Sequence, residues 1–230
     1  MISIVIPTLN ASDGLALTLS SLISGLLSGI IREVIIVDGG SSDQTLEIAE
    51  AAGAKIIQSK CGRGTQLRSG ANAAQKSEWL LFLHADTILE TGWDREVHLF
   101  IEEIKKEKLI DKAAAFRFAL DDTGFMPRLI ELGVALRCSL FRMPYGDQGL
   151  LISHKLYNRV GGFSNMALLE DVDLIRRIGR SRVFILKTCA ITSATRYKSE
   201  GYVRRVLRNW FCLLLYYCRI PVEYIVWIYG

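Results

Sequence analysis

The chain has 230 residues, half of them hydrophobic, and its 28 basic and 24 acidic residues leave a formal net charge of +4. This length fits one large domain with a sizeable core, and the apolar content excludes general disorder. The small positive excess does not indicate nucleic-acid binding; it suits phosphate-bearing ligands, an anionic membrane surface or an ordinary solvated surface.

Five cysteines, odd in number and without a C-x-x-C pair, argue against a disulfide framework and against structural zinc. No signal peptide precedes the apolar run that starts at Ile2, and no stretch reaches the roughly 18 apolar residues that a spanning helix needs. We therefore expect a cytoplasmic protein with reduced thiols.

The first part of the chain alternates between apolar runs and helical patterns. Residues 2–6 (ISIVI) form an apolar run closed by Pro7, which predicts a strand buried on both faces. Leucines spaced by four, three and four residues from Leu15 to Leu26 predict a helix, and Gly29 would stop it. The same patterns predict strands at 33–37, 54–58 and 79–83, a helix capped by Ser41 or Ser42 and ended by Gly53, and a helix at 65–76.

Alternating strands and helices are typical of a mostly parallel α/β sheet, whose ligands bind at the carboxyl ends of the strands. Polar or glycine-rich residues follow each of the four predicted strands, so we expect them to meet at one edge of the sheet. These segments are Pro7-Thr8-Leu9-Asn10, Asp38-Gly39-Gly40-Ser41, Cys61-Gly62-Arg63-Gly64 and His84-Ala85-Asp86.

The second part of the chain is less regular. Apolar spacing predicts helices at 93–104 and 128–141 with a strand at 113–120 between them. No repeat, low-complexity linker or proline-rich hinge divides the chain, so we expect one domain, 1–230. Four leucines of the second helix share one face and are predicted to be structural core residues: Leu129, Leu132, Leu136 and Leu140.

Four motifs together resemble a known family, the inverting glycosyltransferases of family 2, which have the GT-A fold. The similarity runs from residue 2 to about residue 180, and the FLHADT and YGDQG segments also resemble a small bacterial subgroup of that family. In chain order the motifs are SIVIPTLN at 3–10, EVIIVDGGSSDQT at 33–45, FLHADT at 82–87 and VGGFSNMALLEDVDLIRRI at 160–178.

This resemblance implies one glycosyltransferase domain with a GT-A-type α/β fold. Residues 1–90 would bind the nucleotide-sugar, residues 91–200 would hold the acceptor and the catalytic groups, and 201–230 would form an apolar helical segment. The implied reaction moves a sugar from a nucleotide-diphospho-sugar, with UDP-sugars favoured, to an acceptor hydroxyl by a metal-assisted single displacement that inverts the anomeric carbon. The acceptor could be a lipid, a glycan or a small metabolite.

Asp86 matches the last acid of the family's Asp-x-Asp motif, which joins the protein to a Mg²⁺ or Mn²⁺ ion on the donor diphosphate. His84 stands where the first acid is expected, so one hard oxygen ligand is missing. Its neutral imidazole could bind ribose, approach the metal or be structural. In the alternative interpretation, Asp86 caps a helix that begins near Thr87.

Asp38 matches the acidic residue of the family that accepts hydrogen bonds from the nucleotide base, and Gly39 would let the backbone approach the ligand. Arg63 lies in a Gly-Arg-Gly turn and could reach the diphosphate, or the turn could be a plain strand-to-helix connection. The expected donor-binding residues are Pro7, Thr8, Asn10, Asp38, Gly39, Arg63, His84, Ala85 and Asp86.

Asp171 matches the second residue of the family's Glu-Asp pair, and we expect it to be the base that deprotonates the acceptor hydroxyl. A helix start favours its ionised form, and Glu170 would orient it or bind the acceptor. Asp173 is expected to cap or to pair with Arg176 or Arg177. Without the other motifs, this cluster is an ordinary acidic helix start. The acceptor side is expected to hold Asp147, Gln148 and Arg177.

Residues 203–230 mix arginines with aromatic and aliphatic residues, which is typical of an interfacial membrane helix, of a helix buried against the domain or of a dimer contact. Two other functions stay open. One is a degenerate nucleotide-sugar-binding module without turnover, made conceivable by His84. The other is a sugar nucleotidyltransferase, although PTLNASDG lacks the basic residue expected in the first loop of that class.

Overall fold

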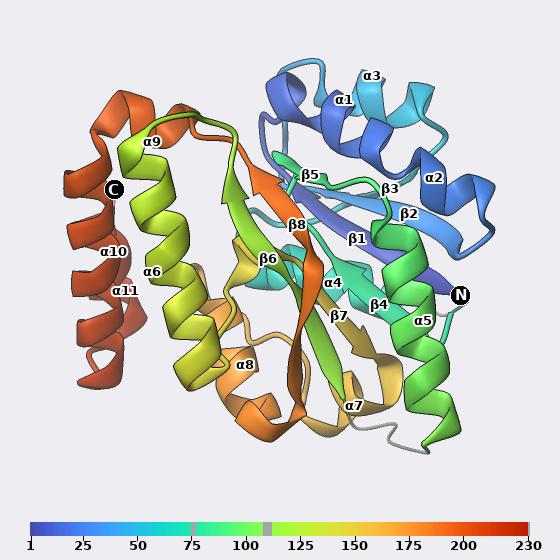
Figure 1. The fold of residues 1–230 in the computed structure, drawn as a ribbon. Coiled ribbons are helices and arrows are strands. Elements are labelled where there is room, and N and C mark those ends of the chain that lie inside the picture. Colours follow the sequence, from blue (N-terminus) through green and yellow to red (C-terminus); the bar gives the residue numbers. More distant parts are fainter. Residues whose placement is uncertain (75–76, 108–111, 230) are drawn as a thin grey trace.

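The protein is described by a computed structural model that covers residues 1–74, 77–107 and 112–229 (Figure 1). It forms one α/β unit whose central sheet is flanked by helices. The first elements are β1 (Ile2–Thr8), α1 (Ser12–Ser21), α2 (Ile23–Leu27), β2 (Ile31–Asp38), α3 (Thr45–Ala51), β3 (Lys55–Gln58), α4 (Arg63–Ala73), β4 (Trp79–Phe82), β5 (Thr87–Leu89) and α5 (Trp93–Lys106).

The second part of the chain adds the remaining strands and a group of C-terminal helices, which lie at the margin of the molecule opposite α5 in Figure 1. Its elements are β6 (Ala113–Leu120), α6 (Phe125–Phe141), the 3-10 turn η1 (Gly146–Gln148), β7 (Leu150–Ser153), α7 (His154–Arg159), α8 (Glu170–Ile178), the 3-10 turn η2 (Arg180–Arg182), β8 (Val183–Thr192), α9 (Thr195–Glu200), α10 (Tyr202–Tyr217) and α11 (Val222–Tyr229).

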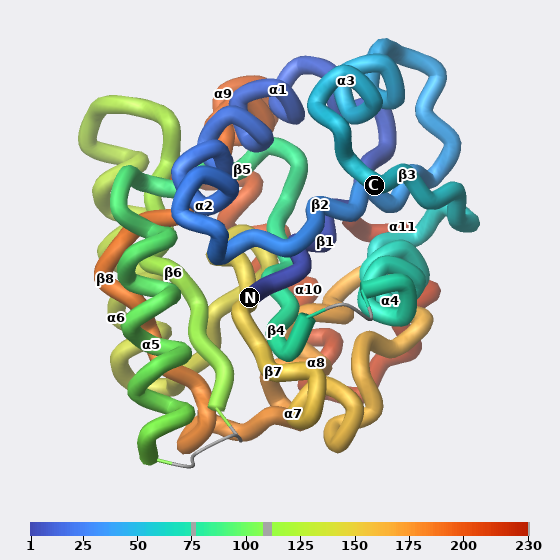
Figure 2. The backbone as a smooth tube through the Cα atoms, turned by 90° about the vertical axis from the view of Figure 1, so that its right-hand side faces the viewer, coloured from blue at the N-terminus to red at the C-terminus, as the bar shows by residue number. Residues whose placement is uncertain are grey.

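The eight strands form one mixed but mostly parallel sheet in the order β3-β2-β1-β4-β7-β6-β8-β5. β1 pairs in parallel with β2 and β4, and β2 pairs in parallel with β3, so the carboxyl ends of these strands share one edge. β7 enters antiparallel between β4 and β6, and β5 runs antiparallel to β8. The tube in Figure 2 shows the sheet from the side, with α5 and α4 on different sides of it.

The core lies on both faces of this sheet because side chains alternate along each strand. In β1, Ile2, Ile4 and Ile6 are fully buried in one cluster, which the residues of α1 and α5 complete. Val5 points the other way, into a second cluster beneath α4, α7 and α8. Burial of each such side chain contributes about 1.5–3 kcal/mol, which explains why the apolar run needs no polar face.

The strands predicted from apolar runs are confirmed, while two helix predictions change in detail. The helix expected over Leu15 to Leu26 is divided at Leu22 into α1 and α2. Neither serine caps α3, because Asp43 accepts the Thr45 N–H at 3.1 Å. The helix expected at 65–76 is α4, and its last two predicted residues, 75–76, lie outside the described residues.

The prediction that the leucine row of α6 packs into the core is wrong. All four leucines are exposed, and Leu132 retains 66% of its accessible surface. α6 has a second apolar face, and that face packs on the end of β6 through Ile130 and Val134. Helical spacing defines each face equally well, so it could not decide which one is covered. Among the described helices, none has the length and hydropathy that crossing a bilayer requires.

Candidate active site

A cavity of about 160 Å³ lies at the carboxyl edge of the parallel strands, where the predicted site segments meet. Asp86, which follows β4, and Asp171, which belongs to the first turn of α8, both line it. Arg63, His84 and Asp147 line the same cavity. Two features bring these residues together although they lie far apart in the chain. The sheet order places β4 beside β1. The segment before α8 contacts the start of α4 through the hydrogen bond from Gly64 N–H to Met166 O.

The turn that carries Asp86 is held from behind by α1. The Thr18 hydroxyl donates to the Ala85 carbonyl at 2.9 Å, and a Cβ on Gly14 would lie 3.0 Å from both Ala85 O and Asp86 Cα. The helix therefore packs close enough that only glycine fits. Thr87 begins strand β5 and not a helix, so Asp86 is not a helix cap. Its carboxylate accepts no hydrogen bond from the described residues, which leaves both oxygens available to a ligand.

Asp86 is suited to a cation that arrives with its own ligands. No group of three or more histidine, cysteine, aspartate or glutamate side chains among the described residues could hold a metal alone. Mg²⁺ in nucleotide sites commonly takes one or two carboxylates and completes its shell with phosphate oxygens and water. One uncommitted carboxylate beside a cavity fits that pattern. Burial, with Arg63 and Arg196 nearby, lowers the pKa of His84 well below its usual value, so this side chain is neutral.

Asp171 is fixed by two backbone donors. The Gly146 N–H donates to Oδ2 at 2.6 Å and the Val172 N–H donates to Oδ1 at 2.7 Å. A Cβ at position 146 would lie 2.8 Å from His84 Nε2 and 3.1 Å from Asp171 Oδ2. A larger residue at position 146 would therefore have to displace the His84 or Asp171 side chain. Each carboxylate oxygen keeps a lone pair for a further donor, such as an acceptor hydroxyl.

Glu170 lies next to Asp171 but is almost completely buried, with 2% of its side chain exposed. Its Oε1 is 3.7 Å from Nε of Arg63. Burial and the neighbouring Asp171 raise the pKa of Glu170 to about 7, against the opposing effect of Arg63. This carboxyl group is therefore placed to orient Arg63 and is far less accessible than Asp171.

The Gly-Arg-Gly turn has a packing reason that the sequence did not reveal. A Cβ on Gly64 would lie 2.3 Å from the Ser164 carbonyl oxygen, and the Gly64 N–H donates to Met166 O at 3.3 Å. The turn is thus pressed against the segment that leads into α8. This contact holds Arg63, at the start of α4, against the cavity.

The two residues of the YGDQG loop have different environments. Gln148 is buried, accepts hydrogen bonds from Arg137 Nη2 and Tyr145 N, and donates to Phe116 O at 2.8 Å. It does not line the cavity and serves to stiffen the loop. Asp147 lines the cavity, and its Oδ1 is buried without a hydrogen-bond partner in the described chain. Burial raises the pKa of Asp147 to about 6.

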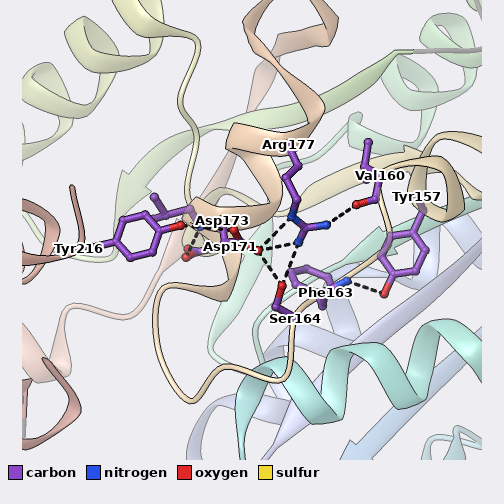
Figure 3. A network of polar contacts seen from close by, with 9 residues as sticks. Tyr157, Val160, Phe163, Ser164, Asp171, Asp173, Arg177 and Tyr216 are labelled. Carbon is purple, nitrogen blue, oxygen red and sulfur yellow. Dashed lines mark hydrogen bonds and ion pairs between the residues drawn. The ribbon is translucent and has the colours of Figure 1, made fainter. Parts of the chain in front are cut away.

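Arg177 belongs to a network behind the cavity, drawn in Figure 3. Its guanidinium donates to Asp173 at 2.7 Å and also to the Val160 carbonyl, which ties α8 to the preceding loop. Ser164 and Tyr216 donate to the same Asp173 carboxylate at 2.7 and 3.3 Å. The expected pairing of Asp173 with an arginine of its own helix is confirmed. Arg177 is not among the residues that line the cavity.

Asp38 is buried at the end of β2 and outside the cavity lining. Its carboxylate accepts hydrogen bonds from the hydroxyls of Thr8 and Ser41 and from the N–H groups of Gly40 and Ser41. In this conformation it organises the loop after β2, and its contact with a nucleotide base stays a prediction. Asn10 joins the same loops by accepting from the Ser42 N–H at 2.9 Å.

Gln66 was not singled out from the sequence, although it ties three of the predicted segments together. Its amide donates to the carbonyls of Thr8 and Val37, each at 2.8 Å, and its Oε1 accepts from the Gly62 N–H. A Cβ on Gly39 would lie 3.1 Å from this amide. A single glutamine on a helix carries no signal in sequence, so only the fold could reveal it.

The C-terminal segment supplies a wall of the cavity that the motifs did not predict. Arg196 and Tyr197 of α9, Arg205 and Asn209 of α10, and Tyr229 of α11 all line it. Within the described chain, Arg205 Nε and Asn209 Oδ1 are buried polar atoms without a hydrogen-bond partner. Positive and amide groups therefore line the same cavity as the carboxylates of Asp86, Asp147 and Asp171.

Comparisons with known proteins found one matching family model and several similar chains. The family model described as "Glycosyl transferase family 2" matches residues 3–164. Glycosyltransferase AglJ of Haloferax volcanii is 27% identical over 173 residues, and the match covers 74% of this chain but only 54% of that protein. The chain thus spans about half the length of this archaeal relative. A PGL/p-HBAD biosynthesis glycosyltransferase of Mycobacterium bovis is 29% identical over 194 residues, covering 74% and 72% of the two chains.

Two solved structures show the same fold at low sequence identity. Glucosyl-3-phosphoglycerate synthase from Mycobacterium tuberculosis, in complex with Mn²⁺, UDP-glucose and phosphoglyceric acid, has a TM-score of 0.61 at 20% identity, covering 96% of this chain and 80% of that one. S. aureus TarS 1–349 in complex with UDP has a TM-score of 0.64 at 17% identity, covering 90% and 64%.

Proposed function

Because this chain belongs to glycosyl transferase family 2 and has the mostly parallel α/β fold of GT-A glycosyltransferases, we propose that it is an inverting glycosyltransferase that uses a nucleotide-diphospho-sugar, with UDP-sugars favoured. One observation carries this proposal: Asp86 and Asp171 line one cavity, although strands β5, β6 and β7 lie between them in the chain. A cavity with a free carboxylate for the donor and a second carboxylate for the acceptor fits group transfer between two bound substrates.

Asp171 would act as the base of the transfer. Its two backbone hydrogen bonds hold the carboxylate in place, and an acceptor hydroxyl could donate to a remaining lone pair. As the hydroxyl oxygen forms its bond to the anomeric carbon, its proton passes to Asp171 and the bond to the diphosphate breaks on the opposite side. Attack and departure on opposite faces invert the anomeric carbon.

Three other residues would serve the donor. Asp86 would hold the Mg²⁺ or Mn²⁺ ion, which supplies charge neutralisation for the leaving diphosphate when it is bound. Arg63, oriented by Glu170 at 3.7 Å, would donate hydrogen bonds to the same phosphates. His84 is neutral, so it can donate to or accept from the donor without adding charge.

The choice of donor and ion is supported by the neighbouring structures, which are described with UDP, with UDP-glucose and with Mn²⁺. The acceptor would be a hydroxyl of a lipid, a glycan or a small metabolite. FLHADT and YGDQG support placement in the small bacterial subgroup that carries both segments. Their structural counterparts here are the turn after β4 and the loop around η1.

The test of the proposal is the variant Asp171→Asn, measured for turnover and for donor binding. Loss of the base should lower kcat by roughly 10²–10⁴-fold. Stabilisation of the protein by a UDP-sugar with Mn²⁺, which amounts to about 2.7 kcal/mol at a hundredfold excess over Kd, should be unchanged. Asp86→Asn should instead lose the Mn²⁺-dependent part of this stabilisation.

Asp173→Asn is the matched control, because Asp173 lies on the same helix but faces the network around Arg177. It should cost about 1–3 kcal/mol of stability and leave kcat nearly unchanged. Equal loss of activity in both aspartate variants would contradict the role of Asp171. Donor binding without transfer or hydrolysis would favour the binding module. Release of pyrophosphate from a nucleoside triphosphate and a sugar phosphate would favour the nucleotidyltransferase.

A further inference from the structure

Two helices present uncovered rows of large apolar side chains. On α6 the row consists of the four leucines that sequence analysis assigned to the core, extended at its start by Phe125. On α10 the row follows the same helical spacing, and Trp210 keeps 69% of its surface exposed. Its exposed members are Val203, Leu207, Trp210, Phe211, Leu214 and Tyr217. We call these two rows together the apolar face.

The two rows belong to one side of the molecule. At the start of the helices, the Tyr202 hydroxyl of α10 donates to Asp122, which lies just before α6. At their ends, the Tyr217 hydroxyl lies 3.8 Å from Met143 Sδ, just after α6. The helices therefore run in the same direction alongside each other, as Figure 1 shows, with the sheet between them and α5.

Basic residues border the apolar face. Arg204 on α10 and Arg219 after it are exposed, and the guanidinium groups of Arg176 and Arg180 lie 5.6 and 5.3 Å from the rings of Tyr216 and Phe141. Of the four arginines after residue 200, Arg205 and Arg208 pair with Glu200, so Arg204 and Arg219 are the two that border this face. The single glutamate of α6, Glu131, is engaged by Arg128 and by the backbone of Leu120.

We propose that the apolar face is a docking surface for an anionic lipid bilayer. Leucine and tryptophan would enter the boundary between headgroups and acyl chains, and the arginines at the border would contact lipid phosphates. A second copy of the chain is a poorer occupant, because a self-complementary contact would bring these arginines against each other. Charge complementarity thus selects the lipid surface.

The position of α10 gives this surface a consequence for the site. Its exposed row faces away from the domain, while Arg205, Asn209 and Cys212 on its other side line the cavity. Only the thickness of one helix, about 10 Å, would separate the bilayer surface from the cavity. An acceptor hydroxyl carried by a membrane lipid would then be within reach. This last step rests on the proposed function, whereas docking itself does not.

Vesicle flotation tests the surface directly. The 230-residue chain is mixed with vesicles of phosphatidylcholine alone or of equal parts phosphatidylcholine and phosphatidylglycerol, at low and high salt. We expect binding to the anionic vesicles that weakens with salt. Leu132→Gln with Leu136→Gln, and separately Leu207→Gln with Trp210→Gln, should each lower the partition coefficient by roughly tenfold or more.

The matched control is Leu27→Gln with Leu99→Gln, which changes two leucines on α2 and α5 that are 84% and 59% exposed. This variant should bind vesicles like the unchanged chain. Unfolding transitions of all variants should agree, since exposed substitutions usually change stability little. Thermal shift by UDP-sugar and Mn²⁺ should persist in each, so a failure of docking is distinguishable from a failure of the proposed function.

Two outcomes would overturn the proposal. Equal binding of the control and the apolar-face variants would show that the vesicles contact another surface. The other outcome is that the unchanged chain binds neither kind of vesicle and sediments as a dimer, whereas the variant Leu207→Gln with Trp210→Gln sediments as a monomer. This result would show that a second copy of the chain covers the apolar face.

Discussion

At the scale of single residues, the site consists of carboxyl groups with contrasting surroundings. Asp171 receives two backbone N–H groups and faces the cavity, whereas its neighbour Glu170 is buried beside Arg63. Asp147 is buried as well, and burial raises its pKa to about 6. Two adjacent acids at a helix start thus have different surroundings, one facing the cavity and the other buried with a raised pKa.

The buried Glu170 predicts a pH-dependent stability. Burial raises its pKa from the ordinary 4.5 to about 7 in the folded chain, so the folded state holds the proton more tightly. The protonated Glu170 therefore contributes to the free energy of unfolding, and this contribution is fully present below pH 4.5. It is lost as the pH rises through 7, and the total loss is about 3 kcal/mol. Relative to Glu170→Gln, the unchanged protein should therefore lose stability between these values.

Chemical denaturation across this pH range measures the difference between the two proteins. Glu47→Gln, an exposed substitution on α3, should follow the unchanged protein at every pH. If the difference between the unchanged protein and Glu170→Gln stays constant with pH, Glu170 does not bind its proton more tightly in the folded state.

At the scale of elements, glycines set how closely helices approach strands. α4 crosses β1 and β2 at Gly70, where a Cβ would lie 2.3 Å from Val5 Cγ1 and 2.8 Å from Val37 Cγ2. Gly133 on α6 has an ordinary helical position with nothing within 4 Å of an added Cβ. Both glycines therefore lie within a helix, but an added Cβ would collide with strand side chains at Gly70 and would meet no atom at Gly133.

Alanine should reveal this difference. Gly70→Ala should destabilise the protein by about 1–3 kcal/mol, because β-strand side chains must move to admit the methyl group. Gly133→Ala should instead stabilise by about 0.5–1 kcal/mol, since alanine loses less backbone entropy in a helix. Urea denaturation of both variants measures the two effects, and a stabilising Gly70→Ala would show that α4 does not approach the sheet this closely.

At the scale of the whole molecule, the cavity at the edge of the sheet is also lined by the C-terminal helices. α10 reaches it from one side and is anchored through Tyr216 to the network around Asp173. Cys212, on the inner side of α10, is buried, while Cys61 and Cys218 are exposed. The thiols therefore report whether α10 is in place.

Thiol labelling of the native protein checks this arrangement. Cys61 and Cys218 should react at once with an aromatic disulfide reagent. Cys212, whose thiol pKa is raised by burial, should react only at the rate of local opening. Donor and Mn²⁺ should slow it further if they fill the cavity. Equal rates for Cys212 and Cys61 would mean that α10 is not packed as described, and Cys212→Ser identifies the slow thiol.

The sequence by itself determined strands β1 to β4 and β6, most of the helices and the carboxyl-edge segments, because apolar periodicity and turn residues act over a few positions. It did not predict β5, β7 or β8. It also identified Asp86 and Asp171, since motif residues keep their order along the chain. Only the tertiary structure decided that Gln148 and Arg177 bond internally, that Gln66 joins the loops and that α6 turns its leucines outward. Each of these outcomes depends on which residues a side chain contacts in the folded protein. Those contacting residues lie far away in the chain, so local sequence patterns do not specify them.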